Sequence, residues 1–146
     1  MKVLVMNGPN LNRLGKREPD IYGYETLEDI EQSLKQMVRD ESVELSFFQS
    51  NIEGELINRI HDAADEGVRG IIFNPGAFTH YSIALRDAVS SVGIDVIEVH
   101  ISNVHKREAF RQQSVIAPVC MGQITGLGTN GYLLALQAFL LNQKGE

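Results

Sequence analysis

Short apolar runs alternate along this chain with longer segments whose apolar side chains recur every three or four residues. The runs are rich in β-branched residues, as in strands buried on both faces of a sheet. They cover residues 2–6, 43–49, 70–74, 94–100 and, more weakly, 119–124. The segments between them have the period of amphipathic helices. Their apolar stripes cover residues 27–38, 56–64, 82–92 and 132–141.

The polar residues ahead of these stripes predict where helices begin. Thr26 with Asp29, and Ser50 with Glu53, have the spacing of a capping box. Ser82 precedes the third stripe and is a suitable N-cap residue. We therefore expect two capping boxes and one simple serine cap.

This order of elements predicts an α/β fold, with a five-stranded parallel sheet between two layers of helices. Ligands of such sheets bind beyond the carboxyl ends of the strands. Each predicted strand ends on a side chain that can form hydrogen bonds, and these are Asn7, Gln49, Asn74, His100 and Gln123. We expect the functional site at this edge.

The segment after the first predicted strand, "NGPNLNRLGKREPDIYGYET", covers residues 7–26 and has no hydrophobic period. It contains three basic residues, two prolines and two tyrosines. A loop of this length without secondary structure is uncommon in a compact domain and is usually functional or disordered. We expect it to close over a ligand.

Composition adds limits on the class of protein. The chain has 146 residues, of which 43% are hydrophobic, and this length predicts a single domain over residues 1–146. No apolar run approaches the roughly 20 residues of a membrane span, and the apolar run near Met1 is too short for a secretory signal. A cytoplasmic protein is expected. One cysteine, Cys120, and four scattered histidines give no disulfide and no metal-site spacing.

Charge narrows the choice of partner. The net charge of −6 argues against nucleic acid and anionic membranes as partners. The basic residues nevertheless gather in two irregular stretches, with Arg13, Lys16 and Arg17 in the first. Lys106, Arg107 and Arg111 lie in the second. If the fold joins these stretches, they form a site for a small anion.

Several familiar motifs are absent. Residues 7–26 do not match the P-loop pattern, and no nucleophile elbow GxSxG occurs in the chain. The string "GLGTNG" at 126–131 fits GxGxxG, but no strand follows to complete a dinucleotide-binding unit, so we interpret it as a turn. A response-regulator site would need acidic residues where Asn7 and Asn74 stand.

The remaining reactive groups suit acid–base chemistry. His100 ends a predicted strand and shares a face with Glu98, two residues earlier. Glu98 is placed to orient either His100 or His80. Tyr22 and Tyr24 end the opening segment, and a cation such as Arg17 favours a phenolate that can act as a base. Spacing alone does not decide between the two tyrosines.

Four blocks of the chain resemble type II 3-dehydroquinate dehydratases. They are "NGPNLNRLGKREPDIYG", "NPGAFTHYSIALRDA", "EVHISNVHKREAFRQQSVIAPV" and "GQITGLGTNGYLLAL". The resemblance implies a flavodoxin-like three-layer sandwich and a hydro-lyase without metal or organic cofactor. It also implies reversible trans-dehydration of 3-dehydroquinate to 3-dehydroshikimate through an enolate, in the shikimate pathway or in quinate breakdown. Family members assemble as homododecamers, each a tetramer of trimers.

Matching the motifs residue by residue implies four catalytic positions. Tyr22 of REPxxYG is the base that removes a proton next to the ketone, and Arg17 of the same motif makes the phenol more acidic. His100 of EVHxSN protonates the departing hydroxyl. Asn10, the second asparagine of NGPN, serves the enolate oxygen.

The same comparison implies six substrate-binding positions. They are Asn74, His80, Asp87, Ile101, Ser102 and Arg111. Asn74 and His80 hold substrate hydroxyls, and Ile101 and Ser102 bind the carboxylate. Asp87 is expected to reach the site of a neighbouring chain. A competing hypothesis is a flavodoxin-like module that binds a small anion without turnover, which needs the arginines but not the Tyr22, Arg17 and His100 set.

Overall fold

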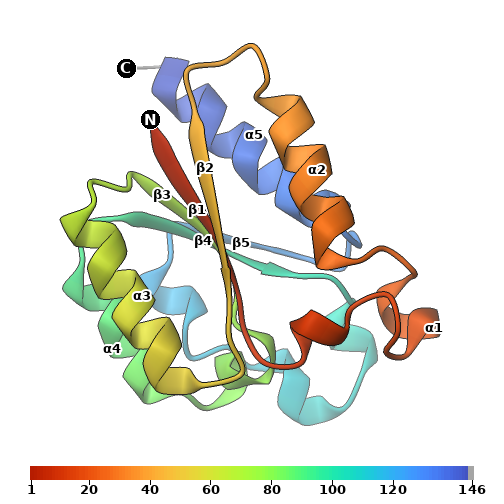
Figure 1. The fold of residues 1–146 in the computed structure, drawn as a ribbon. Coiled ribbons are helices and arrows are strands. Elements are labelled where there is room, and N and C mark those ends of the chain that lie inside the picture. The colour runs from red at the N-terminus through yellow and green to blue at the C-terminus, as the bar shows by residue number, and fades with distance from the viewer. Residues whose placement is uncertain (145–146) are drawn as a thin grey trace.

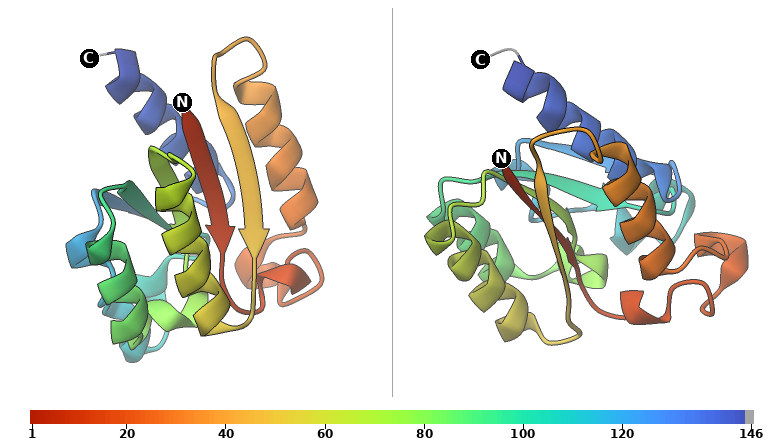
Figure 2. Two further views of the ribbon diagram at one scale, coloured as in Figure 1. Left: turned by 60° about the vertical axis from the view of Figure 1, so that its left-hand side comes forward. Right: turned by 45° about the horizontal axis from the view of Figure 1, so that its top comes forward.

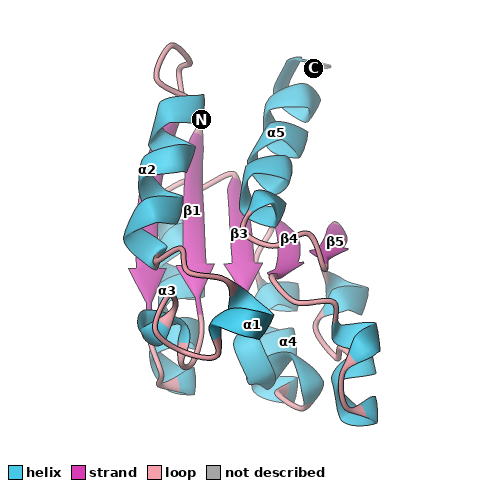
Figure 3. Cartoon of the chain, turned by 90° about the vertical axis from the view of Figure 1, so that its right-hand side faces the viewer, coloured by secondary structure: helices cyan, strands magenta, loops and turns pink. Residues whose placement is uncertain are grey.

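A computed structural model describes residues 1–144 of the chain and contains one five-stranded parallel sheet. The strands are β1 (Lys2–Asn7), β2 (Glu44–Gln49), β3 (Gly70–Asn74), β4 (Asp95–His100) and β5 (Gly122–Thr125). Their order in the sheet is β2-β1-β3-β4-β5, which is the flavodoxin-like order. The predicted fold class is confirmed, and the arrows of β1 and β3 in Figure 3 point toward the same edge.

Two pairs of helices cover the two faces of the sheet (Figures 1 and 2). α2 (Leu27–Met37) and α5 (Asn130–Lys144) lie on one face. α3 (Glu53–Asp65) and α4 (Ile83–Ser91) lie on the other. The result is a three-layer arrangement in which the sheet is the middle layer.

Alternating side chains of the central strands supply the two halves of the core. Val3 and Val5 of β1 pack toward α2 and α5, whereas Leu4 and Met6 pack toward α3 and α4. All four are at most 1% exposed. Successive strand residues point to opposite faces, so a strand that is apolar at every position needs cover on both sides. This explains the continuous run "VLVM".

The helix starts are partly as predicted. Thr26 accepts from the N–H of Asp29, whose carboxylate accepts from the N–H of Thr26, so the first capping box is confirmed. Ser82 caps α4 by accepting from the N–H of Leu85. The prediction of a second capping box was wrong, because Ile52, and not Ser50, is the N-cap residue of α3.

Ser50 and Glu53 have other partners. The Ser50 hydroxyl closes a local turn by accepting from the N–H of Ile52, and it donates to the Glu55 carboxylate at 2.5 Å. The Glu53 carboxylate accepts from Ser82 at 2.6 Å. The bond between Glu53 and Ser82 therefore connects the starts of α3 and α4.

The fifth strand is shorter than predicted. Residues Ala117–Val119 form a 3₁₀ turn, and β5 begins only at Gly122. The Ser114 hydroxyl accepts from the N–H of Ala117 at 2.9 Å, and Pro118 has no N–H to give to a ladder, so this stretch turns instead of pairing. Gln123 therefore lies within β5, and the strand ends at Thr125 opposite His100.

Residues 7–26 contain two short helical pieces that the sequence did not predict. A 3₁₀ turn covers Leu11–Arg13, and α1 covers Pro19–Tyr22. The residues immediately before them, Asn10 and Glu18, have φ angles of 70° and 39°. This left-handed conformation is uncommon outside glycine, and it turns the chain at the carboxyl edge of the sheet.

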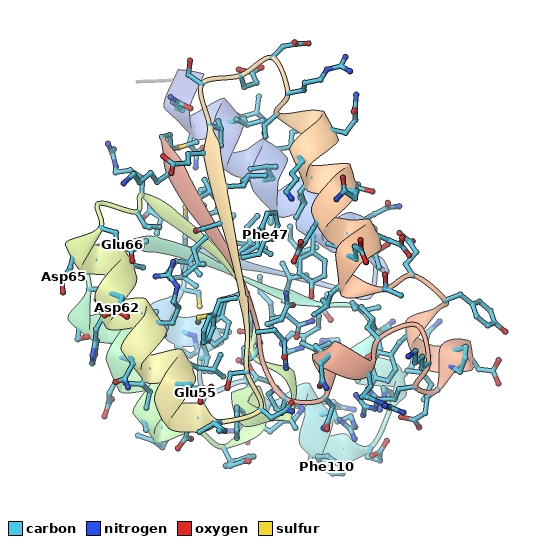
Figure 4. The ribbon with its side chains drawn as sticks, viewed as in Figure 1. Phe47, Glu55, Asp62, Asp65, Glu66 and Phe110 are labelled. Carbon is cyan, nitrogen blue, oxygen red and sulfur yellow. The ribbon has the colours of Figure 1, made fainter. Side chains whose placement is uncertain are left out.

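Met1 and the last turn of α5 lie at the opposite edge of the sheet from α1 (Figure 1). Met1, Asn142 and Gln143 line one small cavity there. Acidic side chains gather elsewhere, along the exposed side of α3, where Figure 4 labels Glu55, Asp62, Asp65 and Glu66. No helix among residues 1–144 is long and apolar enough to cross a membrane.

Candidate active site

A cavity of about 200 Å³ lies at the carboxyl edge of the sheet, near the ends of β1 and β3. From β1 the chain continues to β2 on one side of the sheet, and from β3 it continues to β4 on the other side, so this is the point where the strand order reverses. Nine of the ten site residues expected from the sequence line this cavity. They are Asn10, Arg17, Tyr22, Asn74, His80, His100, Ile101, Ser102 and Arg111. Asp87 does not, because it lies on the exposed side of α4. The two basic stretches thus meet in one cavity, as expected for a small-anion site.

Tyr22, at the end of α1, lies between two guanidinium groups. Arg107 donates from Nη1 to the Tyr22 hydroxyl at 2.8 Å and to the Ser102 hydroxyl at 3.1 Å. The guanidinium carbon of Arg17 lies 4.7 Å from the centre of the Tyr22 ring. Tyr24, by contrast, is 78% exposed. Geometry therefore favours Tyr22 over Tyr24 as the phenol beside the arginines.

His100 pairs with Glu98 on the same face of β4. The carboxylate of Glu98 accepts from Nε2 of His100 and also from Thr79 at 2.5 Å and Ser114 at 2.9 Å. Burial raises the pKa of the Glu98 carboxyl, but the hydrogen bond and charge of His100, with the two hydroxyls, outweigh burial and hold the pKa below its ordinary value. The Glu98 carboxylate therefore fixes the orientation of the His100 ring at the cavity.

Glu98 does not contact His80. Nδ1 of His80 lies 2.8 Å from the carbonyl oxygen of Gln113, which can only accept, so Nδ1 carries a proton. The choice that the sequence left open is therefore settled in favour of His100. In a neutral His80, Nε2 is left as a hydrogen-bond acceptor.

Backbone geometry brings Asn10 and Asn74 to the cavity. The N–H of Gly8 donates to the Asn74 carbonyl at 2.8 Å, and a Cβ on Gly8 would lie only 2.5 Å from the Pro75 carbonyl oxygen. Only glycine allows the loops after β1 and β3 to approach this closely. Beyond it, the left-handed Asn10 donates its N–H to the Asn51 side chain at 2.8 Å.

A larger and more open cavity, of about 530 Å³, lies beside the first. Tyr22, Ser102 and Arg107 line both cavities, whereas His100, Asn10 and Asn74 line only the smaller one. The bond between Tyr22 and Arg107 therefore forms part of the wall between them. The complete set of proton-transfer groups belongs to the smaller cavity.

Two other features bear on possible chemistry. Among residues 1–144, no group of three or more His, Cys, Asp or Glu side chains is arranged to hold a metal ion. Burial, with a smaller effect of the Glu98 charge, raises the pKa of the Cys120 thiol to about 12. The thiol therefore stays protonated at neutral pH.

Sequence reasoning placed Arg107 in a basic cluster but gave it no specific role. Arg107 is the residue that contacts the Tyr22 oxygen, and nothing in its spacing separates it from Lys106 or Arg111. Thr79 and Ser114 were also missed, because a hydroxyl that serves a buried carboxylate leaves no periodic trace in a sequence. Tyr132 was interpreted only as part of an apolar helix.

The parallel sheet, the phenol between two arginines and the histidine–glutamate pair define an α/β enzyme for proton transfer on a small anion. The family model described as dehydroquinase class II matches residues 1–140. The chain belongs to this family. A 3-dehydroquinate dehydratase from Bacillus pumilus (strain SAFR-032) is 60% identical over 142 residues, which cover 97% of this chain and 95% of that protein.

Solved structures agree with this membership. A type II dehydroquinase from Butyrivibrio crossotus DSM 2876 has a TM-score of 0.93 and 50% identity, covering 96% of this chain and 97% of that one. A type II dehydroquinase from Propionibacterium acnes has a TM-score of 0.90 and 43% identity, covering 94% of each chain.

Proposed function

We propose that this chain dehydrates 3-dehydroquinate to 3-dehydroshikimate in the shikimate pathway, as a hydro-lyase that forms an enolate. The named activity of its relatives supports this substrate. The observation that carries the proposal is that a phenol between two arginines and a carboxylate-paired imidazole line the same cavity of about 200 Å³. A small hydroxylated carboxylate suits a cavity lined by Arg17, Arg107 and Arg111.

The first step is removal of a proton from the carbon next to the ketone. The Tyr22 phenolate takes this proton, and the C–H electron pair moves toward the carbonyl oxygen to give the enolate. Arg17 and Arg107 stabilise the phenolate before the transfer. Asn10 supplies hydrogen bonding near the enolate oxygen, directly or through water.

The second step is loss of the hydroxyl group. The enolate electrons form the new C=C bond as the C–O bond breaks, and His100 gives its proton to the departing oxygen, so that water leaves. His100 is then neutral and Tyr22 is protonated. Returning one proton from Tyr22 to His100 through solvent restores the starting state, and Glu98 favours the protonated His100.

Substrate binding is assigned to the remaining groups of the cavity. Ile101 and Ser102 bind the carboxylate, partly through their backbone N–H groups, and Arg111 also contacts the substrate. Asn74 and His80 hold the hydroxyl groups. These roles would orient the ring so that Tyr22 and His100 act on adjacent carbons.

Asp87 completes the site from a neighbouring chain. It lies exposed on α4, outside the cavity of its own chain, and this position supports contact with another copy. We propose a homododecamer built as a tetramer of trimers, with no metal or organic cofactor required by the steps above. The whole of residues 1–146 forms one catalytic domain, and a single cysteine suits the cytoplasm.

The direct test is to incubate the purified protein with 3-dehydroquinate and follow the enone absorbance of the product. A steady rise that His100→Ala strongly reduces is the expected result. The competing anion-binding module predicts that 3-dehydroquinate binds without any rise in absorbance. Product formation at the wild-type rate by His100→Ala would contradict the role of His100 as the acid.

A further inference from the structure

A buried chain of three side chains connects the last helix to two strand ends. The Tyr132 hydroxyl, on α5, donates to Oδ1 of Asn7 at 2.5 Å and accepts from Nδ2 of Asn74 at 2.9 Å. Tyr132 is completely buried, and Asn7 and Asn74 are 5% and 3% exposed. Among the three, only Asn74 lines the cavity of about 200 Å³.

The direction of each hydrogen bond in this chain follows from one fixed donor. The backbone N–H of Gly76 can only donate, and it lies 3.1 Å from the Asn74 side chain, so the Asn74 atom facing it is the carbonyl oxygen Oδ1. Nδ2 must then face Tyr132, whose hydroxyl accepts. The single proton of that hydroxyl is therefore donated to Asn7, whose Oδ1 accepts the hydrogen bond.

An amide nitrogen has two hydrogens, and Tyr132 receives only one of them. These bonds do not use the second N–H of Asn74, which is left as a donor for a ligand in the cavity, beside the second lone pair of Oδ1. A reversed amide would set Nδ2 against the Gly76 N–H, and two donors cannot bond. Tyr132 and Gly76 therefore hold the two ends of one amide in a single orientation.

We infer that Tyr132 is a positioning residue that makes Asn74 a hydrogen-bond donor toward the substrate. The inference rests on the proposed function for the identity of the ligand, a hydroxylated ring. Asn74 then donates a hydrogen bond to a substrate oxygen, which accepts it through a lone pair. A phenylalanine at 132 would fill the same space in the core but would remove this hold on the amide.

The first experiment compares KM and kcat for Tyr132→Phe with those of the wild-type enzyme. We expect KM for 3-dehydroquinate to rise about tenfold, which corresponds to about 1.4 kcal/mol, with a smaller change in kcat. Phe139→Leu is the control, because Phe139 is buried on the same helix but lies beside Gly70, at the start of β3, and lines the cavity near Met1. It should lower the thermal midpoint and leave KM unchanged.

A double-mutant cycle separates positioning from general loosening of the core. If Tyr132 acts through Asn74, then Tyr132→Phe should add no further rise in KM to the Asn74→Ala variant. Full additivity of the two changes overturns the inference. If Tyr132→Phe fails to fold, Asn7→Ala takes its place, because it removes the acceptor of the Tyr132 proton without touching the cavity, and it should raise KM in the same direction.

Binding measured without turnover keeps this inference separate from the proposed function. In the Tyr22→Phe background, calorimetry gives the Kd of 3-dehydroquinate, and adding Tyr132→Phe should weaken it about tenfold. An unchanged Kd in a folded protein overturns the role of Tyr132, whatever the turnover assay shows. Absence of turnover by the wild-type protein, with the Kd effect present, contradicts only the proposed reaction.

Discussion

Tyr22 has its two arginines in different places, and the difference defines what each contributes. Arg107 bonds to the phenol oxygen, where negative charge is greatest in the phenolate. Arg17 lies over the ring and acts on the charge spread through it. Arg17 also contacts the Glu18 carboxylate at 3.4 Å, which offsets part of its positive charge. The guanidinium carbon of Arg107 also lies 5.3 Å from the ring centre, so Arg107 contacts both the oxygen and the ring.

Removing the phenol oxygen should stop catalysis with little effect on binding. A general base contributes about 10²–10⁴-fold to the rate, so Tyr22→Phe should lower kcat by that factor while the Kd for 3-dehydroquinate stays near the wild-type value. Steady-state kinetics and calorimetry measure the two quantities. Tyr24→Phe is the control, since this exposed side chain lies outside the cavity, and it should keep wild-type kcat. Equal losses in the two variants would contradict the assignment of the base.

Glu98 links the site to acid stability. Its pKa is lowered in the folded protein from an ordinary value of 4.5, so the folded state binds its proton less readily than the unfolded state does. The stabilisation is fully present above pH 4.5 and is lost as the pH falls through the lowered folded value.

We therefore expect the wild-type free energy of unfolding to fall between pH 6 and pH 3 by more than that of Glu98→Gln. Urea unfolding at a series of pH values measures both slopes. Glu28→Gln, an exposed change on α2, serves as the control and should follow the wild-type curve. Parallel curves for wild type and Glu98→Gln would exclude this link.

At the scale of elements, the caps determine where helices begin beside the site. α2 starts directly after the opening segment, and its reciprocal Thr26–Asp29 bonds fix the point at which that segment ends. Loss of the Thr26 hydroxyl leaves an N–H at the helix start without its partner.

Thr26→Ala should destabilise the protein by about 1 kcal/mol, measured as the free energy of unfolding in urea. Ser33→Ala is the matched control, because Ser33 is exposed in the middle of the same helix. Alanine is the better helix former there, so this change should be neutral or slightly stabilising. A loss of the same size in both variants would show that the cap is not the cause.

The secondary-structure elements and most residues of the candidate site could be predicted from patterns in the sequence. In a chain that alternates strand and helix patterns, apolar runs such as "VLVM" and "GIIFN" are stable as buried strands. Parallel strands then bring their carboxyl ends to one edge of the sheet. Asn74 and His100 followed from that topology, and Tyr22, Arg17 and Asn10 from the family motifs. None of these needed side-chain geometry.

What could not be predicted depends on contacts between distant residues. Arg107 and Tyr22 are far apart in the chain, and Tyr132 has the pattern of a core residue until its hydroxyl is placed between two asparagines. The Ser50–Glu53 spacing fits a capping box, but Glu55 and Ser82 compete successfully for these side chains. A short-range sequence pattern does not show which other residues of the folded chain compete for a side chain.

At the scale of the whole molecule, the exposed Asp87 makes the proposed site depend on assembly. In a ring of three chains, the contact is between unlike surfaces of neighbouring copies. In the proposed assembly, each site would take Tyr22 from its own chain and Asp87 from the next one.

Mixing two inactive variants should therefore restore activity. When Tyr22→Phe and Asp87→Ala chains are refolded together in equal amounts, about one quarter of the sites should combine an intact Tyr22 with an intact neighbouring Asp87. The enone assay measures the recovery, and each variant refolded alone is the control. Failure of the mixture to exceed the more active parent would contradict a shared site.

Met1 and the last turn of α5 lie away from the loops that line the candidate site (Figure 1). The strands between them are up to six residues long, which at about 3.3 Å per residue corresponds to about 20 Å. Attaching a label or a surface tether beside Met1 or at the last turn of α5 would thus leave the cavity of about 200 Å³ unobstructed within the chain. An immobilised or fluorescent form of this enzyme is accordingly best prepared through its termini, and labels in the opening segment are best avoided.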